Sequence, residues 1–119
     1  MARWPADAAD LARVQGELAG AGPPAWAPPP GRLVVGGCYV CFARGVTQAG
    51  AEGDPGVAGA AVIRGRRLLA AAVVVGPAGA PYRPALLALR EGALLEDAVR
   101  ALPLRPDEIG RASCRERVS

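Results

Sequence analysis

The sequence predicts a small α/β domain, in which a three-stranded antiparallel meander is followed by a helix. Three apolar runs, residues 32–42, 57–63 and 68–75, are rich in valine and alanine and are joined by glycine-containing connections, as in successive strands of a sheet. Residues 84–102 instead repeat apolar side chains with a helical period. A helix that crosses back over the meander favours a fourth strand parallel to the first, because such connections are short and right-handed.

The composition fits one small domain and argues against several classes of protein. The chain has 119 residues and a net charge of +3, and all of its 14 basic residues are arginine. This charge is too small to indicate nucleic-acid binding by itself. No apolar run reaches roughly 18 residues, and the N-terminus has no apolar signal core. We therefore expect no membrane partner and a cytoplasmic location with reduced thiols.

The N-terminal part of the chain is expected to hold a helix and a connector. Residues 5–19 have an amphipathic pattern, acidic residues in the first turn, and Gly20 and Gly22 as stop signals. The proline-rich residues 23–30 can form neither a helix nor a central strand. We interpret them as a stiff connector, with a ligand for an aromatic groove as the alternative, and expect Trp26 to pack on the core.

The first predicted strand, residues 32–42, is nearly all apolar, so we expect both of its faces to be buried. It contains a C-x-x-C pattern formed by Cys38 and Cys41. Residues three apart on a strand point to opposite faces, and the chain has no histidine to complete a zinc site. Both cysteines are therefore interpreted as small buried side chains rather than as metal ligands or a redox pair.

The predicted helix at residues 84–102 carries a carboxylate on its apolar face. Leu87 and Leu94 mark that face, whereas Arg90 is assigned to the polar side. Glu91 falls near the middle of the apolar face, one turn from Leu87. A carboxylate buried there must be paired, protonated or bound to a metal, because an isolated buried charge is costly. The simplest interpretation is that Glu91 reaches the edge of the face or pairs with an arginine.

A motif at the start of this helix resembles a known family. The sequence Pro81-Tyr82-x-Pro84-x-Leu-Leu-x-Leu-Arg90-Glu91 is similar to P-Y-x-P-G-x-L-x-F-R-E, the motif of the endonuclease V family, the deoxyinosine 3′-endonucleases. The resemblance implies that Tyr82, between Pro81 and Pro84, is the wedge that probes nucleic acid at a lesion. It also implies that Glu91 is a catalytic, metal-binding carboxylate.

Two positions depart from the family's pattern. Ala85 stands where the family usually has glycine. Residues 35–42 resemble the family's first strand, A-G-x-D-V-x-F, in which the aspartate binds metal, and Tyr39 occupies the position of that aspartate. A phenol is a poor Mg²⁺ ligand, because its pKa is about 10 and Mg²⁺ prefers carboxylates. The helix is expected to lay Glu91 over the first strand, near Tyr39.

The resemblance implies a ribonuclease H-like α/β fold, of which the chain holds the N-terminal part and is truncated before the fourth strand. It implies a Mg²⁺-dependent endonuclease that cuts DNA or RNA near deaminated bases such as inosine, and no stable protein partner. One alternative is a catalytically inactive nucleic-acid-binding relative, because Tyr39 replaces the metal-binding aspartate. The other is an unrelated α/β scaffold with a coincidental motif.

The last twelve residues differ in composition from the rest of the chain. Residues 108–119 abandon the alanine- and proline-rich pattern, and they resemble the translation of a common sequencing adapter. We therefore expect residues 1–107 to be the N-terminal part of an endonuclease V-like domain and residues 108–119 to be a non-native tail. The alternative is a genuine basic tail. With one candidate carboxylate, Glu91, the chain itself is expected to be inactive, to bind Mg²⁺ weakly and to aggregate.

Overall fold

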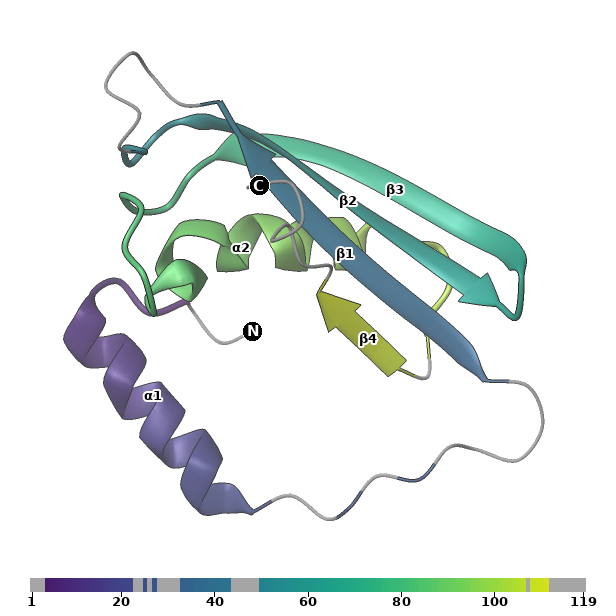
Figure 1. Cartoon of the computed structure of the whole chain (residues 1–119), viewed down its shortest axis with the longest axis horizontal. Helices are drawn as coiled ribbons and strands as arrows, with labels where there is room; N and C mark the ends of the chain where they lie inside the picture. The colour runs from purple at the N-terminus through teal and green to yellow at the C-terminus, as the bar shows by residue number, and fades with distance from the viewer. Residues whose placement is uncertain are drawn as a thin grey trace.

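One four-stranded sheet organises the chain, and a helix covers one of its faces (Figure 1). The elements that form this layer pair are β1 (Val34–Phe42), β2 (Pro55–Arg64), β3 (Arg67–Pro77), α2 (Leu87–Arg100) and β4 (Glu108–Arg111). The strand order is β3-β2-β1-β4, with β1, β2 and β3 antiparallel in sequence and β4 parallel to β1. The predicted meander, the crossing helix and the parallel position of the fourth strand are therefore confirmed.

The coordinates come from a computed structural model, and they describe residues 4–22, 25, 27, 33–43, 50–106 and 108–111. Trp26 and the greater part of the proline-rich connector lie outside the described residues. Within the described part of the chain, neither helix has the length and the apolar character that crossing a lipid bilayer requires.

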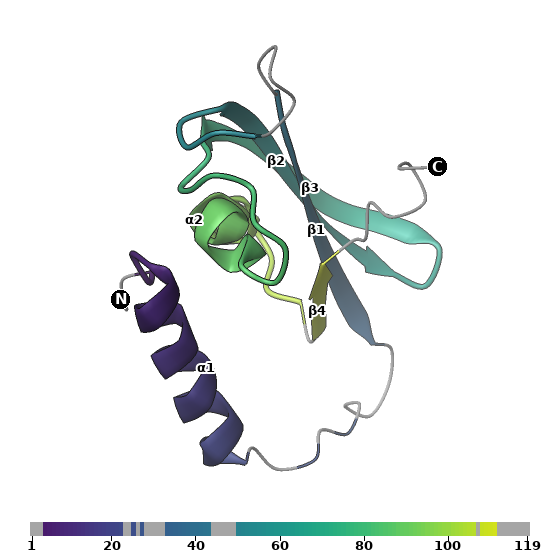
Figure 2. The same ribbon diagram turned by 60° about the vertical axis from the view of Figure 1, so that its left-hand side comes forward.

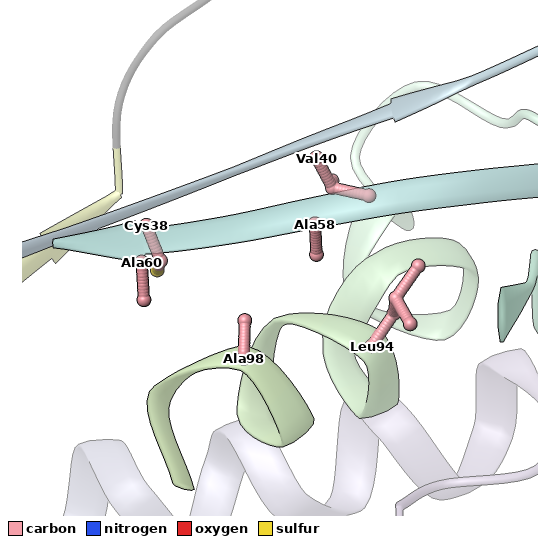
Figure 3. Packing of buried hydrophobic residues seen from close by; sticks show 6 residues of the cluster. All are labelled: Cys38, Val40, Ala58, Ala60, Leu94 and Ala98. Carbon is pink, nitrogen blue, oxygen red and sulfur yellow. The ribbon is translucent and has the colours of Figure 1, made fainter. Parts of the chain in front are cut away.

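The core lies between α2 and the neighbouring strands β1 and β2 (Figure 3). Because side chains alternate along a strand, every second residue of β1 and β2 faces the helix. The buried cluster consists of Cys38, Val40, Ala58, Ala60, Leu94 and Ala98. Small side chains on both layers let the helix approach the sheet closely, and a core this small stabilises the chain only modestly.

The opposite face of the sheet is not covered by any described element (Figure 2). Val57, Val73 and Val75 are 50%, 70% and 76% exposed there. The prediction that the first strand is buried on both faces is therefore wrong, because α2 covers one face only. Cys38 and Cys41 do point to opposite faces, but Cys41 is exposed rather than buried.

The fourth strand corrects one detail of the expected fold. Glu108–Arg111 forms β4 and pairs with β1, from Val35 opposite Glu108 to Cys38 opposite Arg111. We expected the chain to lack this strand, and a segment of the tail takes its place. The physical reason is that the edge of β1 offers free main-chain donors and acceptors, which any extended segment delivered there by the crossover can use.

The helix α1 (Ala8–Ala21) begins three residues later than predicted, because Asp7 caps it: the Asp7 carboxylate accepts a hydrogen bond from the Asp10 N–H. Gly22, in the left-handed conformation, ends it, whereas Gly20 lies inside the helix. Figure 2 shows α2 between α1 and the sheet.

The segment before α1 is held against α2 by Trp4. The Trp4 indole N–H donates to a Glu96 carboxylate oxygen at 3.1 Å. Its ring covers Gly92 so closely that an added Cβ atom would collide with it. The N-terminal segment is therefore fitted to the outer face of α2, away from the sheet.

Candidate nucleic-acid interface

The candidate interface is the turn at residues 81–86, which joins β3 to α2. The Leu86 N–H donates to the Arg83 carbonyl at 3.1 Å across Pro84 and Ala85. Ala85 has a φ of 67°. Proline in the second position and a positive φ in the third are the features of a type II turn, in which glycine is favoured at the third position.

This turn explains why α2 begins at Leu87 and not at residue 84, as predicted. A residue in the left-handed conformation cannot continue a right-handed helix, so Ala85 interrupts the helical pattern. Pro84 therefore shapes the turn before the helix and is not a first-turn helical residue.

The side chain of Tyr82 is exposed, while its main chain is held. Tyr82 is 43% exposed, and Pro81 and Pro84 on either side of it are exposed as well. The Tyr82 N–H donates to the Gly50 carbonyl at 3.0 Å. The turn between the two prolines therefore presents an aromatic ring to solvent, as the wedge role implied by the motif requires.

Gly50 fits this contact because it lacks a side chain. Its φ is 71°, a left-handed value that favours glycine, and a Cβ atom there would lie 3.0 Å from the Tyr82 Cβ. A larger residue at position 50 would therefore displace the segment that carries the exposed ring.

Arg90, on α2, bonds to the loop before β2 and to the segment after β3. One guanidinium nitrogen, Nη1, donates to the Ala51 carbonyl at 3.1 Å and to the Ala80 carbonyl at 3.0 Å. The other, Nη2, donates to Asp54 Oδ2 at 3.0 Å in an ion pair. Arg90 is only 4% exposed, so its assignment to the polar side of the helix is wrong.

The environment of Arg90 accounts for this burial. Its Cζ atom lies 4.6 Å from the centre of the Phe42 ring, in a cation–π contact at the end of β1. Asp54 also accepts the Ala51 N–H at 2.8 Å, so the carboxylate organises the loop as well as the arginine. We call Arg90, Asp54 and Phe42 the arginine clamp.

Sequence reasoning missed the arginine clamp, although one signal was present. A cation in the first turn of a helix faces the positive end of the helix dipole, which is unfavourable unless it has another partner. Arg90 is the fourth residue of α2. Its partner, Asp54, lies 36 residues earlier in the chain, so no local pattern identifies it.

Glu91 is buried on α2, with 9% of its surface exposed, which confirms its predicted position on the apolar face. Glu91 also takes part in an interaction within the chain. Tyr39, in contrast, lies on the sheet face that points away from α2, beside Gly59 and Val73. The expectation that α2 lays Glu91 near Tyr39 is therefore wrong, because alternation along β1 turns Tyr39 to the other face.

The described residues do not fit a Mg²⁺ site. Mg²⁺ in proteins is held by carboxylates in a near-octahedral arrangement. Among the described residues, no three histidine, cysteine, aspartate or glutamate side chains lie close enough together to hold a metal. Glu91 is a single carboxylate, and Tyr39 lies on the sheet face that points away from α2.

Comparisons with known proteins identify similar folds. No protein-family model and no curated protein matches the chain. The structure is similar to that of endonuclease V from Streptomyces avermitilis, with a TM-score of 0.70 and 33% identity. That match covers 92% of this chain and 46% of the other protein.

A second similar structure is that of endonuclease V from Bacillus subtilis, with a TM-score of 0.66 and 21% identity, covering 87% of this chain and 43% of that protein. The chain therefore spans less than half the length of both proteins. The expected fold class is confirmed by these two matches and by the strand order.

Proposed function

From the premise that this chain has an endonuclease V-like fold, we propose that it recognises nucleic acid as part of a nuclease. The fold shared with two endonuclease V proteins supports the nuclease class. The finer proposal is that the substrate is DNA or RNA with a deaminated base, inosine above all. The complete protein would hydrolyse a phosphodiester bond near that base.

The observation that carries the proposal is the exposed ring of Tyr82 on an anchored turn. The Tyr82 N–H is bound to Gly50, and Arg90 holds the neighbouring Ala80 carbonyl, so the main chain beneath the ring is fixed at two points. A fixed aromatic ring can stack on a base that has left its pair, which contributes about 1–3 kcal/mol per base. Because Pro81 and Pro84 already restrict the backbone of the turn, nucleic-acid binding costs little additional conformational entropy there.

Glu91 is proposed as a carboxylate that a metal site in the complete protein would use. A metal ion held there would supply stabilisation of charge on the phosphate oxygens and activation of water. The described residues do not fit Mg²⁺ by themselves, so Glu91 would need further carboxylates, and the other described residues serve only to bind and orient the nucleic acid in our proposal.

A second candidate function is binding without cleavage, and the position of Tyr39 favours it. Tyr39 stands where the resembled motif has an aspartate, and it lies on the sheet face opposite α2. Tyr39 therefore supplies no second carboxylate ligand for a metal ion beside Glu91. The protein would then recognise deaminated bases without hydrolysing the strand.

Nicking measurements test the candidate function of this chain. We expect the 119-residue chain to show no Mg²⁺-dependent nicking of inosine-containing DNA or RNA, because it offers too few carboxylates. The Tyr39→Asp variant should also be inactive, since residue 39 and Glu91 occupy opposite faces of the sheet. Metal-dependent nicking by the natural chain, measured on labelled strands, would show that our assignment of the metal ligands is wrong.

Binding measurements test the role of Tyr82. We expect Tyr82→Ala to weaken binding to an inosine-containing strand roughly 5- to 150-fold, the loss of one stacked base. Tyr82→Phe keeps the ring and should bind nearly as well as the natural chain. Fluorescence anisotropy with labelled oligonucleotides gives both affinities.

The melting temperature of each Tyr82 variant supplies the control. Because the ring is 43% exposed, its removal should change the melting temperature little. If Tyr82→Ala lowers the melting temperature strongly and leaves binding unchanged, the ring is structural and the proposed recognition role fails.

A further inference from the structure

A group of arginines lies at the tip of the hairpin between β2 and β3. Arg64 ends β2, Gly65 turns with a φ of 59°, and Arg66 and Arg67 lead into β3. All three arginines are exposed. This segment, which we call the arginine hairpin, places three positive charges within four residues.

The arginines of the hairpin differ from three other described arginines, each of which forms an ion pair with a carboxylate. Arg13 is paired with Asp10 and Glu17, Arg90 with Asp54, and Arg100 with Glu96. Across the residues that the structure describes, no ion pair or side-chain hydrogen bond involves an arginine of the hairpin. Its guanidinium donors are therefore exposed to solvent and available to a ligand.

We propose that the arginine hairpin is a contact site for the phosphate backbone of nucleic acid, separate from the Tyr82 turn; this inference rests on the proposed function. A guanidinium group presents paired donors that match two phosphate oxygens, and exposed arginines without carboxylate neighbours are free to make such bonds. Phosphate contacts carry no base information, so the hairpin adds affinity and orientation without selecting the lesion.

The position of the hairpin in the fold supports this division of roles (Figure 1). The strand β3 has 11 residues and runs from the hairpin toward the Tyr82 turn. At about 3.3 Å per residue, the two ends of β3 are roughly 35 Å apart, and the Tyr82 turn follows the end far from the hairpin. The hairpin arginines line a hollow together with Leu33, Val35 and Ile63, so they border a concave surface.

Two matched double variants test the inference. Arg66→Gln/Arg67→Gln removes two hairpin arginines without partners, and Arg13→Gln/Arg100→Gln removes two arginines that are already paired with carboxylates. Both variants lower the net charge equally. We expect the slope of log affinity against log salt for a DNA duplex without inosine to fall by about 2 in the hairpin variant and to stay unchanged in the control.

A third variant separates loss of charge from loss of folding. Arg66→Lys/Arg67→Lys keeps both charges and should retain the salt dependence of the natural chain. The three variants should share one melting temperature, because all the changed side chains are exposed. Equal slopes in the hairpin and control variants would overturn the inference, since net charge alone would then explain binding.

The same assay distinguishes failure of the inference from failure of the proposed function. If the natural chain prefers inosine through Tyr82 and the hairpin variant keeps its salt slope, only the hairpin site is wrong. If the natural chain binds no nucleic acid but binds vesicles of anionic phospholipid, the hairpin contacts a membrane surface, and both proposals fail.

Discussion

Ala85 shows how a single residue can carry backbone strain beside a candidate site. Its φ of 67° lies in the left-handed region, where a Cβ atom meets the following carbonyl at a cost of about 1–2 kcal/mol. The turn needs this conformation to direct the chain from Tyr82 into α2. A methyl group at this position therefore lowers the stability of the fold without adding a contact that the turn requires.

We expect Ala85→Gly to stabilise the chain by about 0.5–1 kcal/mol, because glycine relieves the strain but loses more entropy on folding. Thermal unfolding should show a melting temperature a few degrees higher. The matched control is Ala93→Gly, an exposed position inside α2, where the same change should cost about 1 kcal/mol. A fall of equal size in both variants would contradict the type II turn at residues 83–86.

At the scale of elements, the arginine clamp connects α2 to segments far from it in sequence. Arg90 reaches the loop before β2, the turn after β3 and the end of β1 through hydrogen bonds and the Phe42 ring. A buried ion pair contributes little net stability relative to apolar residues of similar size. Removing only one partner of the pair is costly, because the remaining buried charge then has no counter-charge.

We expect Asp54→Ala to destabilise the chain by about 3–5 kcal/mol, since it leaves the Arg90 guanidinium buried without a carboxylate. Urea denaturation measures the free energy of unfolding. As the control, Asp97→Ala removes an exposed carboxylate from α2 and should change the free energy of unfolding by about 0.5 kcal/mol or less. The double variant Asp54→Ala/Arg90→Met should recover part of the stability that Asp54→Ala loses. A loss below about 1 kcal/mol for Asp54→Ala alone would contradict the clamp.

At the scale of the whole molecule, the sheet face that no described element covers is the dominant physical feature. Val57, Val73 and Val75 expose apolar side chains side by side across β2 and β3. Contiguous apolar surface of this kind promotes association, and a long edge strand such as β3 adds main-chain groups for pairing.

We expect the chain to associate in a concentration-dependent manner through this face. Val73→Lys/Val75→Lys places two charges on it and should shift sedimentation toward the monomer. Ala12→Lys/Ala19→Lys adds the same charges at exposed positions of α1 and should leave the sedimentation of the chain unchanged. A natural chain that sediments as a monomer at all concentrations would contradict this expectation.

Local patterns in the sequence were sufficient for α1, the three strands of the meander and α2, but they did not predict β4 at residues 108–111. The strands, the crossing helix, the exposure of Tyr82 and the burial of Glu91 all follow from periodicity and turn residues, which depend on neighbours within a few positions. The motif at residues 81–91 also indicated the fold that the comparisons support. Element ends were less accurate, because a cap at Asp7 and a left-handed residue at Ala85 set them.

Only the tertiary structure decided which of these residues meet. The sequence by itself determined that an arginine and a glutamate stand next to each other on a helix, and it placed Arg90 with the polar residues. Burial of Arg90 arises from Asp54 and Phe42, which the sheet brings to the start of α2 from distant positions. Likewise, Tyr39 is separated from Glu91 because one face of the sheet receives α2 and the other does not. Side-chain alternation is local, but the cover on each face depends on how the whole chain packs.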